Sequence, residues 1–259
     1  VSIVITDVKN SRGENLEFNQ TADKLNIDLQ QTYAHTDTFD IVIDYYLKEQ
    51  VKGLRFIDAT EKSPFQVSSD CFPNKARQWI PCYDYPHDKF TQEMIVTVDK
   101  KYKVLSNGSL MGIKESDNNK HTVYWSQHKP HSTYLISLSI ADYAVIEDSL
   151  GSLPVNYWVY HTNVEDAKRS IEKTPYMIDF FNKLYDYPFP WEKYDQVISA
   201  YMGGGAEATS ATLLGEGAVT SEKAAIDFSY EGIIAHEIAH QWWGDLITCR
   251  SWEHTWMNE

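Results

Sequence analysis

The chain has 259 residues, enough for one large domain or two ordinary ones, and 42% of them are hydrophobic, which excludes a largely disordered protein. Its formal net charge of −14 argues against a nucleic-acid-binding protein, which would normally present a basic face, so no nucleic-acid partner is expected. The sequence has no run of about 18 apolar residues, and no transmembrane segment is expected. The three cysteines, Cys71, Cys82 and Cys249, fit no disulfide framework or zinc knuckle.

The first part of the chain shows the pattern of β-structure. Apolar and polar residues mostly alternate over 39–47, and 94–98 and 134–140 are further strand candidates. Turn-forming clusters such as Ser106-Asn-Gly108 lie between them. Many short strands without a long helical period predict a β-sheet domain or sandwich.

The pattern changes near residue 151, after which helical spacing appears. We therefore predict a first domain over 1–151, whose start is expected to be missing, and a second domain over 152–259. The elements expected in the second domain are a strand at 155–160, a helix at 164–184, a strand at 194–200, a loop or sheet-edge segment at 203–205, a helix at 229–246 and the start of another helix at 252–259.

His236 and His240 lie four positions apart within a stretch expected to be helical. Residues with this spacing share one helical face, so both imidazoles can reach one metal ion, with Glu237 beside them. A catalytic zinc site takes three such ligands and leaves one position for water. Glu259, 19 residues after His240, is expected to return to the ion as the third ligand. With 9 histidines and 37 acidic residues in 259, two histidines and an acid at these offsets should occur by chance roughly 0.05 times, so the alternative of ordinary surface side chains keeps little weight.

The sequence around these residues resembles a known family. The run His236-Glu-Ile-Ala-His-Gln-Trp-Trp-Gly-Asp245, followed by Trp256-Met-Asn-Glu259, is similar to the signature of the aminopeptidase N family of zinc metallopeptidases, the gluzincins. That signature has eighteen residues between the second His and the Glu, as residues 241–258 provide here. The resemblance implies one zinc ion per full-length chain, with His236, His240 and Glu259 as ligands and Glu237 as the general base. It also implies an α+β fold, with an N-terminal saddle-like β-sheet domain followed by the start of a thermolysin-like α/β catalytic domain.

A second family element lies upstream of the histidines. Family members have a Gly-x-Met-Glu-Asn segment on a sheet edge facing the zinc, and the aligned residues here are Gly204-Gly-Ala-Glu-Ala208. The resemblance implies that Glu207, with Gly204, Gly205 and Ala206 beside it, binds the free α-amine of a peptide substrate, because a carboxylate pairs with an ammonium. The Met and Asn of the family are replaced by alanines. Without the resemblance, Glu207 would be interpreted as a solvated loop acid.

A third element lies in the β-rich part. The run Trp79-Ile-Pro-Cys-Tyr-Asp-Tyr-Pro-His-Asp-Lys89 resembles the family's N-terminal saddle-like domain and is expected to form turns and packing contacts. Just before it, family members often carry a Gln and a Glu or Gln that help to bind the substrate amine. Asp70 and Phe72 stand in those places. Asp70 is expected to contribute charge to the amine pocket, whereas Phe72 has no charge to contribute.

The resemblance therefore implies a zinc-dependent aminopeptidase that acts on peptide or protein N-termini. Two alternatives stay open: a non-catalytic binding or scaffold protein of the same fold, which Phe72 and the altered 204–208 segment favour, and a zinc endopeptidase. Glu253 and Asp245 are candidate acids next to the ligating histidines. The family's oxyanion-stabilising Tyr lies well downstream of the third ligand, so the present chain is expected to be an inactive fragment. The sequence indicates neither the compartment nor the oligomeric state.

Overall fold

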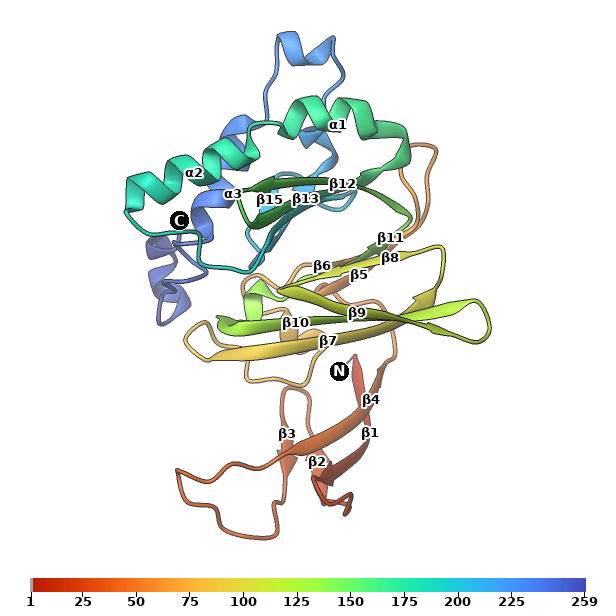
Figure 1. Cartoon of the computed structure of the whole chain (residues 1–259). Coiled ribbons are helices and arrows are strands. Elements are labelled where there is room, and N and C mark those ends of the chain that lie inside the picture. Colours follow the sequence, from red (N-terminus) through yellow and green to blue (C-terminus); the bar gives the residue numbers. More distant parts are fainter. Residues whose placement is uncertain (1) are drawn as a thin grey trace.

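The computed structural model describes residues 2–259, which form five β-sheets and three α-helices (Figure 1). The chain begins with two small sheets: β1 (Ile3–Asn10) pairs antiparallel with β4 (Ile41–Leu47), and β2 (Phe18–Gln20) pairs with β3 (Leu25–Ile27). Apolar side chains of this lobe form a small separate core that includes the fully buried Val8. The lobe lies at the end of the molecule opposite the helices (Figure 1).

Two larger antiparallel sheets follow. The three-stranded sheet has the order β7-β10-β9, with β7 at Lys89–Asp99, β10 at Lys120–Ser132 and β9 at Ser109–Ser116. The four-stranded sheet has the order β5-β6-β11-β8, with bounds Leu54–Ile57, Gln66–Ser69, Leu138–Ala141 and Lys103–Ser106. These sheets confirm the β-rich first part of the expected α+β fold.

The second half of the chain contains a mixed five-stranded sheet. Its order is β12-β13-β14-β16-β15, with bounds Tyr143–Leu150, Leu153–Tyr160, Tyr194–Ser199, Ala211–Gly215 and Gly205–Ala206. The three inner strands run parallel, and the two edge strands run antiparallel to their neighbours. Every residue of β14 and β16 is buried, as expected for strands that are covered on both faces.

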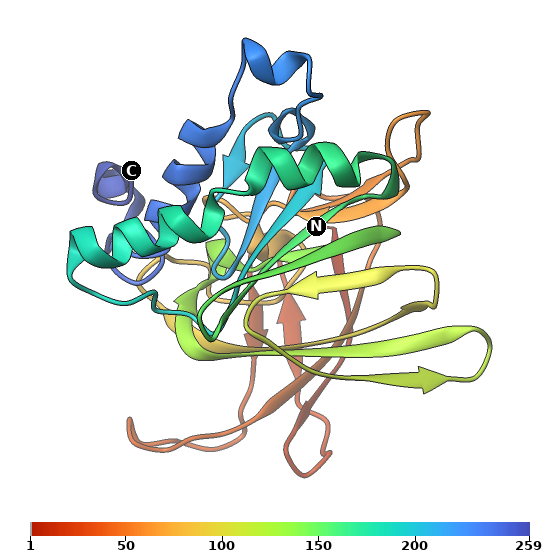
Figure 2. The same cartoon turned by 45° about the horizontal axis from the view of Figure 1, so that its top comes forward.

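Three helices accompany this sheet. α1 (Val164–Ile171) and α2 (Thr174–Tyr185) connect β13 to β14 along one face of the sheet (Figures 1 and 2), and α3 (Glu231–His240) packs against β15 and β16. The prediction of one helix over 164–184 is wrong, because a second helix begins at Thr174 with Pro175 in its first turn. Proline lacks the amide hydrogen that a continuing helix needs. Within residues 2–259, no helix has both the length and the apolar character needed to cross a membrane.

Other expected elements differ in their bounds. The strand predicted over 134–140 is divided into a 3-10 turn at 133–135 and β11, and the last helix is a 3-10 helix at Trp252–Met257. Gly205 and Ala206 lie at the sheet edge as β15, in agreement with the prediction for 203–205. Residue 151 falls in the turn between β12 and β13, which belong to one sheet. The division into domains 1–151 and 152–259 stays a prediction.

A buried ion pair of the second half contacts the first half through its lysine. Lys193, directly before β14, is 5% exposed, and its Nζ lies 3.1 Å from Oδ2 of the fully buried Asp195. The same ammonium lies 5.1 Å from the ring centroid of Trp125 in β10. Asn156 and Trp158 donate hydrogen bonds to the Asp195 carboxylate, which further offset the cost of burying its charge. The main hydrophobic core likewise runs through both halves.

Candidate metal centre

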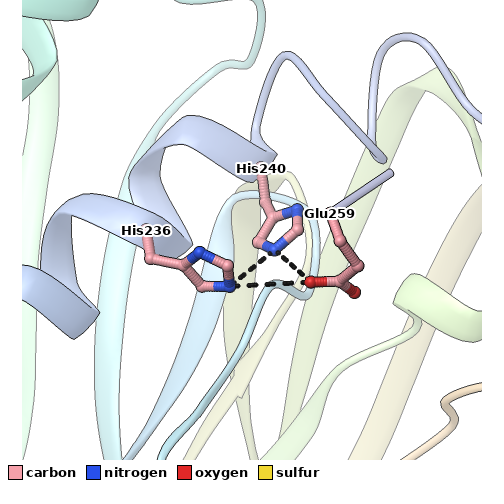
Figure 3. A group of neighbouring side chains, drawn as sticks. All are labelled: His236, His240 and Glu259. Carbon is pink, nitrogen blue, oxygen red and sulfur yellow. Dashed lines mark hydrogen bonds and ion pairs between the residues drawn. The ribbon is translucent and has the colours of Figure 1, made fainter. Parts of the chain in front are cut away.

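The last two turns of α3 present two imidazoles on one face. His236 and His240 project side by side from the helix (Figure 3), with their Nε2 atoms 3.0 Å apart. The spacing of four residues produces this arrangement, because positions i and i+4 lie one above the other on a helix. The His240 side chain is 5% exposed and the His236 side chain 53%, so the pair lies at the boundary between core and solvent.

Glu259 completes a three-residue cluster. Its Oε2 lies 3.7 Å from His236 Nε2 and 3.5 Å from His240 Nε2 (Figure 3). Ligands at the usual zinc distances of roughly 2.0–2.2 Å in a tetrahedral arrangement lie about 3.4 Å apart. The three separations are close to that value, so the donor set and its geometry fit one zinc ion. These three residues, expected from the sequence to be ligands, are therefore brought together.

A backbone contact orients His240. Its Nδ1 lies 2.9 Å from the carbonyl oxygen of Trp243, which can only accept, so Nδ1–H donates this hydrogen bond and Nε2 is left free for a metal. The carbonyl is available because α3 ends at His240 and the chain turns at Gly244, whose φ is +106°. The helix predicted over 229–246 is thus wrong beyond residue 240, and the early end creates the contact.

Glu237 lies on the same helix and is directed into the interior. It is 4% exposed, and its Oε2 has no hydrogen-bond partner among residues 2–259. Burial, together with the negative charges of Glu207 and Glu259, raises the pKa of Glu237 to about 9. A divalent cation at the neighbouring ligands would oppose this shift, because a nearby positive charge favours the ionised carboxylate.

Glu207 directly follows β15 and is buried, with 9% of its surface exposed. Desolvation raises its pKa, while the charge of His240 acts in the opposite direction. Its position is fixed by Gln241, the residue that follows α3: Gln241 Nε2 donates to the Glu207 carbonyl oxygen at 3.0 Å. The Oε1 atom of the same side chain accepts from the Ser210 amide at 2.8 Å. The structure thus holds Glu207 and the histidine-bearing helix together.

Asp70 lies close enough for its charge to affect Glu207, but it forms an ion pair with Lys75. That pairing offsets much of the charge that the sequence assigned to the amine pocket. Phe72 packs its ring edge-on against Tyr134 and Trp252, at centroid distances of 5.9 and 5.2 Å. The substrate-binding roles expected for Asp70 and for the segment 204–206 stay predictions.

Neither of the two acids that the sequence suggested as partners of the ligating histidines forms a hydrogen bond to them. Glu253 accepts a hydrogen bond from Ser251, and its side chain is 75% exposed. Asp245 is fully buried, and burial raises its pKa well above the usual value, but among residues 2–259 its carboxyl group makes no hydrogen bond to either histidine. The Trp243 carbonyl oxygen, and not an acidic side chain, accepts the hydrogen bond from His240. Sequence reasoning missed it because a backbone oxygen has no residue-type signal.

Comparison with known proteins agrees with this geometry. Residues 2–135 match the Peptidase M1 N-terminal domain, and residues 169–259 match the Peptidase family M1 domain. The chain belongs to peptidase family M1. The resemblance expected from the motif is thereby confirmed, together with the succession of an N-terminal β domain and the start of a catalytic domain.

The sequences of known M1 relatives are similar to this sequence over most of its length. A leucyl aminopeptidase of Saccharolobus solfataricus is 27% identical over 256 residues, which are 95% of this chain and 31% of that protein. A leukotriene A-4 hydrolase of Xenopus laevis is 31% identical over 195 residues, 74% of this chain and 30% of that protein. The chain thus spans about a third of the length of these relatives.

A crystal structure of a two-domain M1 zinc metallopeptidase bound to L-arginine has the same fold. The two structures superpose with a TM-score of 0.83 at 20% sequence identity. The superposition covers 99% of this chain and 58% of the other chain. At this identity the likeness concerns the fold, which is the α+β arrangement expected from the sequence.

Proposed function

We propose that the whole protein is a zinc-dependent aminopeptidase that hydrolyses the first peptide bond of peptides or proteins. The observation that carries the proposal is the convergence of His236, His240 and Glu259 next to two buried carboxyl groups. The names of the relatives support the reaction class, since one of them is a leucyl aminopeptidase. The proposed site would bind one zinc ion per full-length chain.

The residues of the site fit the hydrolysis of an amide. Zinc held by the three ligands would polarise a water molecule and the scissile carbonyl. Glu237 would accept a proton from the attacking water and pass it to the leaving nitrogen. A carbon–oxygen bond forms as the carbon–nitrogen bond breaks, so the products are one free amino acid and a peptide with a new amino terminus.

Glu207 would restrict this reaction to chain ends. A peptide carries a free α-ammonium only on its first residue, and a desolvated carboxylate pairs strongly with such a group. Because Glu207 lies beside the metal ligands, an ammonium bound there would place the first peptide bond at the metal. The backbone of Gly204, Gly205 and Ala206 would line the same site. Asp70 would add a negative charge that its ion pair with Lys75 partly offsets.

A substrate panel separates this function from the two alternatives. Aminoacyl-coumarins and N-terminally blocked peptides would be offered to the whole zinc-loaded protein and to its Glu237→Gln variant. Cleavage of the free aminoacyl substrates alone, lost in the variant, is expected. Cleavage of blocked peptides would indicate an endopeptidase, and no cleavage of either would indicate the non-catalytic scaffold that the alanines of the 204–208 segment favour.

The metal is tested separately by mass spectrometry. We expect about one zinc ion per chain in the protein and a loss of bound zinc in Glu259→Ala, because two histidines alone give an incomplete coordination sphere. Undiminished zinc in the variant would contradict the assignment of Glu259. The inactivity expected for residues 1–259 alone stays a prediction.

A further inference from the structure

Asn258, the neighbour of the proposed third ligand, connects two distant parts of the chain. It is 2% exposed. Its Oδ1 accepts a hydrogen bond from the Cys249 amide at 2.8 Å, and its Nδ2 donates one to the Tyr134 hydroxyl at 3.2 Å. Tyr134 lies 124 positions earlier, between β10 and β11 of the β-rich half. A buried amide with both ends bonded has a single orientation, so Asn258 fixes the backbone that leads into Glu259.

Tyr134 is itself held firmly. It is 4% exposed, and its ring meets Phe72 and Trp252 edge-on, with centroids 5.9 and 5.0 Å away. Edge-on contacts of this kind stabilise one ring position. The hydroxyl is therefore a fixed point of the β-rich half, to which Asn258 is attached.

The same hydroxyl lies near the back of the other buried ligand. A Cβ atom on Gly244 would stand 3.3 Å from the Tyr134 hydroxyl oxygen and 3.3 Å from His240 Nδ1. The tyrosine hydroxyl and the imidazole therefore both border the small space beside the Gly244 Cα atom. Glu259, in contrast, has few contacts of its own: its side chain is 46% exposed, and its amide donates to the Thr255 carbonyl at 3.4 Å.

We propose that Asn258 and Tyr134 are positioning residues for the metal site: they set the place of Glu259, so metal affinity is controlled from the N-terminal β domain. This inference rests on the proposed function, because it takes His236, His240 and Glu259 as the ligands. Neither residue belongs to the group of three proposed ligands. Both act through the ligand next to them, as outer residues commonly do at metal sites.

The test is a titration of the metal-free whole protein with Co²⁺, whose visible absorption reports the number and geometry of its ligands. Tyr134→Phe keeps the ring contacts and removes only the hydroxyl, and we expect Co²⁺ affinity to fall about tenfold, with an altered spectrum. Asn258→Ala should weaken binding by about 10–100-fold. In the Asn258→Ala background, Tyr134→Phe should have almost no further effect, because the shared hydrogen bond is already absent.

Two controls separate positioning from general destabilisation. Tyr143→Phe removes another buried hydroxyl, which donates to the Ile198 carbonyl at 3.2 Å, and should leave Co²⁺ affinity and spectrum unchanged. Asn258→Asp can accept from both Cys249 N–H and Tyr134 O–H, so it should bind Co²⁺ more tightly than Asn258→Ala. Wild-type affinity and spectrum in Tyr134→Phe would overturn the inference, even if Asn258→Ala fails to fold. No stoichiometric Co²⁺ binding by the wild-type protein would overturn the proposed metal site itself, and this inference with it.

Discussion

The carboxyl group of Glu237 occupies the space into which a side chain at Gly205 would project. The three atoms nearest to a Cβ at position 205 all belong to Glu237, so strand β15 and helix α3 approach each other at a point where only glycine fits. Gly205, which stands at the variable position of the family motif, thus leaves room for the proposed base.

Gly205→Ala should therefore displace Glu237. We expect kcat to fall by about 10²-fold, since a shift of about 1 Å in a reacting group has effects of that size. Zinc content should stay near the wild-type value, because no ligand is touched. Gly203→Ala is the matched control, since a Cβ there meets no atom within 4 Å. Equal losses in both variants would show that flexibility of the segment matters and not its contact with Glu237.

Glu237→Gln removes the proposed base with little change in shape. Turnover should fall by about 10²–10⁴-fold, the usual contribution of a general base, while zinc stays bound. The measurement is kcat on an aminoacyl-coumarin together with metal content. Glu253→Gln serves as the control, because the exposed Glu253 contacts neither histidine and its replacement should leave kcat unchanged. Loss of zinc in Glu237→Gln would contradict the separation of base from ligands.

His131 should make stability depend on pH. It is buried in β10, and neither ring nitrogen has a hydrogen-bond partner among residues 2–259. Burial, followed by the charge of Lys89, lowers its pKa to about 3. Unfolded histidine titrates near pH 6.5, so from about pH 6.5 down to about pH 3 the unfolded state binds a proton that the folded state does not. The free energy of unfolding should fall as the pH falls through this window.

Urea unfolding of wild-type protein and His131→Leu at pH 7.5 and pH 4 measures this effect. The variant keeps an apolar contact with Phe90, which lies 5.3 Å from the histidine ring, and cannot titrate. Its loss of stability between the two pH values should be smaller than that of the wild type. The same pH dependence in both proteins would show that other groups cause the acid sensitivity.

Lys193→Met should destabilise the fold by roughly 3–5 kcal/mol, because it leaves the Asp195 carboxylate buried without its partner. The double variant Lys193→Met/Asp195→Asn removes both charges and should recover part of that loss. The midpoints of urea unfolding measure both effects. A double variant less stable than the single one would mean that the hydrogen bonds of Asp195 to Asn156 and Trp158 outweigh the ion pair.

Sequence patterns predicted the type of fold better than its elements. Strand β4 alternates clearly and was expected, whereas the 13-residue β10 was not. Along β10 the alternate positions His121, Val123, Trp125 and Gln127 are buried, so polar residues share this core-facing register and break the hydrophobic alternation. Only the partners in the folded sheet show that these positions face inward.

The candidate site divides in a similar way. Motif spacing predicted that His236, His240 and Glu259 would meet, and the structure brings them together. The contact between His240 and the Trp243 carbonyl and the hydrogen bond between Asn258 and Tyr134 were not predictable. The first depends on where a helix ends, and the second joins residues 124 positions apart. Side-chain identity gives no direct signal for either.

Gln241 carries a consequence for the products of the reaction. Its backbone continues from His240, and its side chain holds the Glu207 carbonyl and the Ser210 amide. These two hydrogen bonds tie the backbone of the Glu207 segment to the end of the helix, so they help to fix the distance from the histidines to the Glu207 carboxyl group. Under the proposed function, this distance decides how many residues are released in each turnover. One glutamine amide would thereby help to limit the released product to a single amino acid.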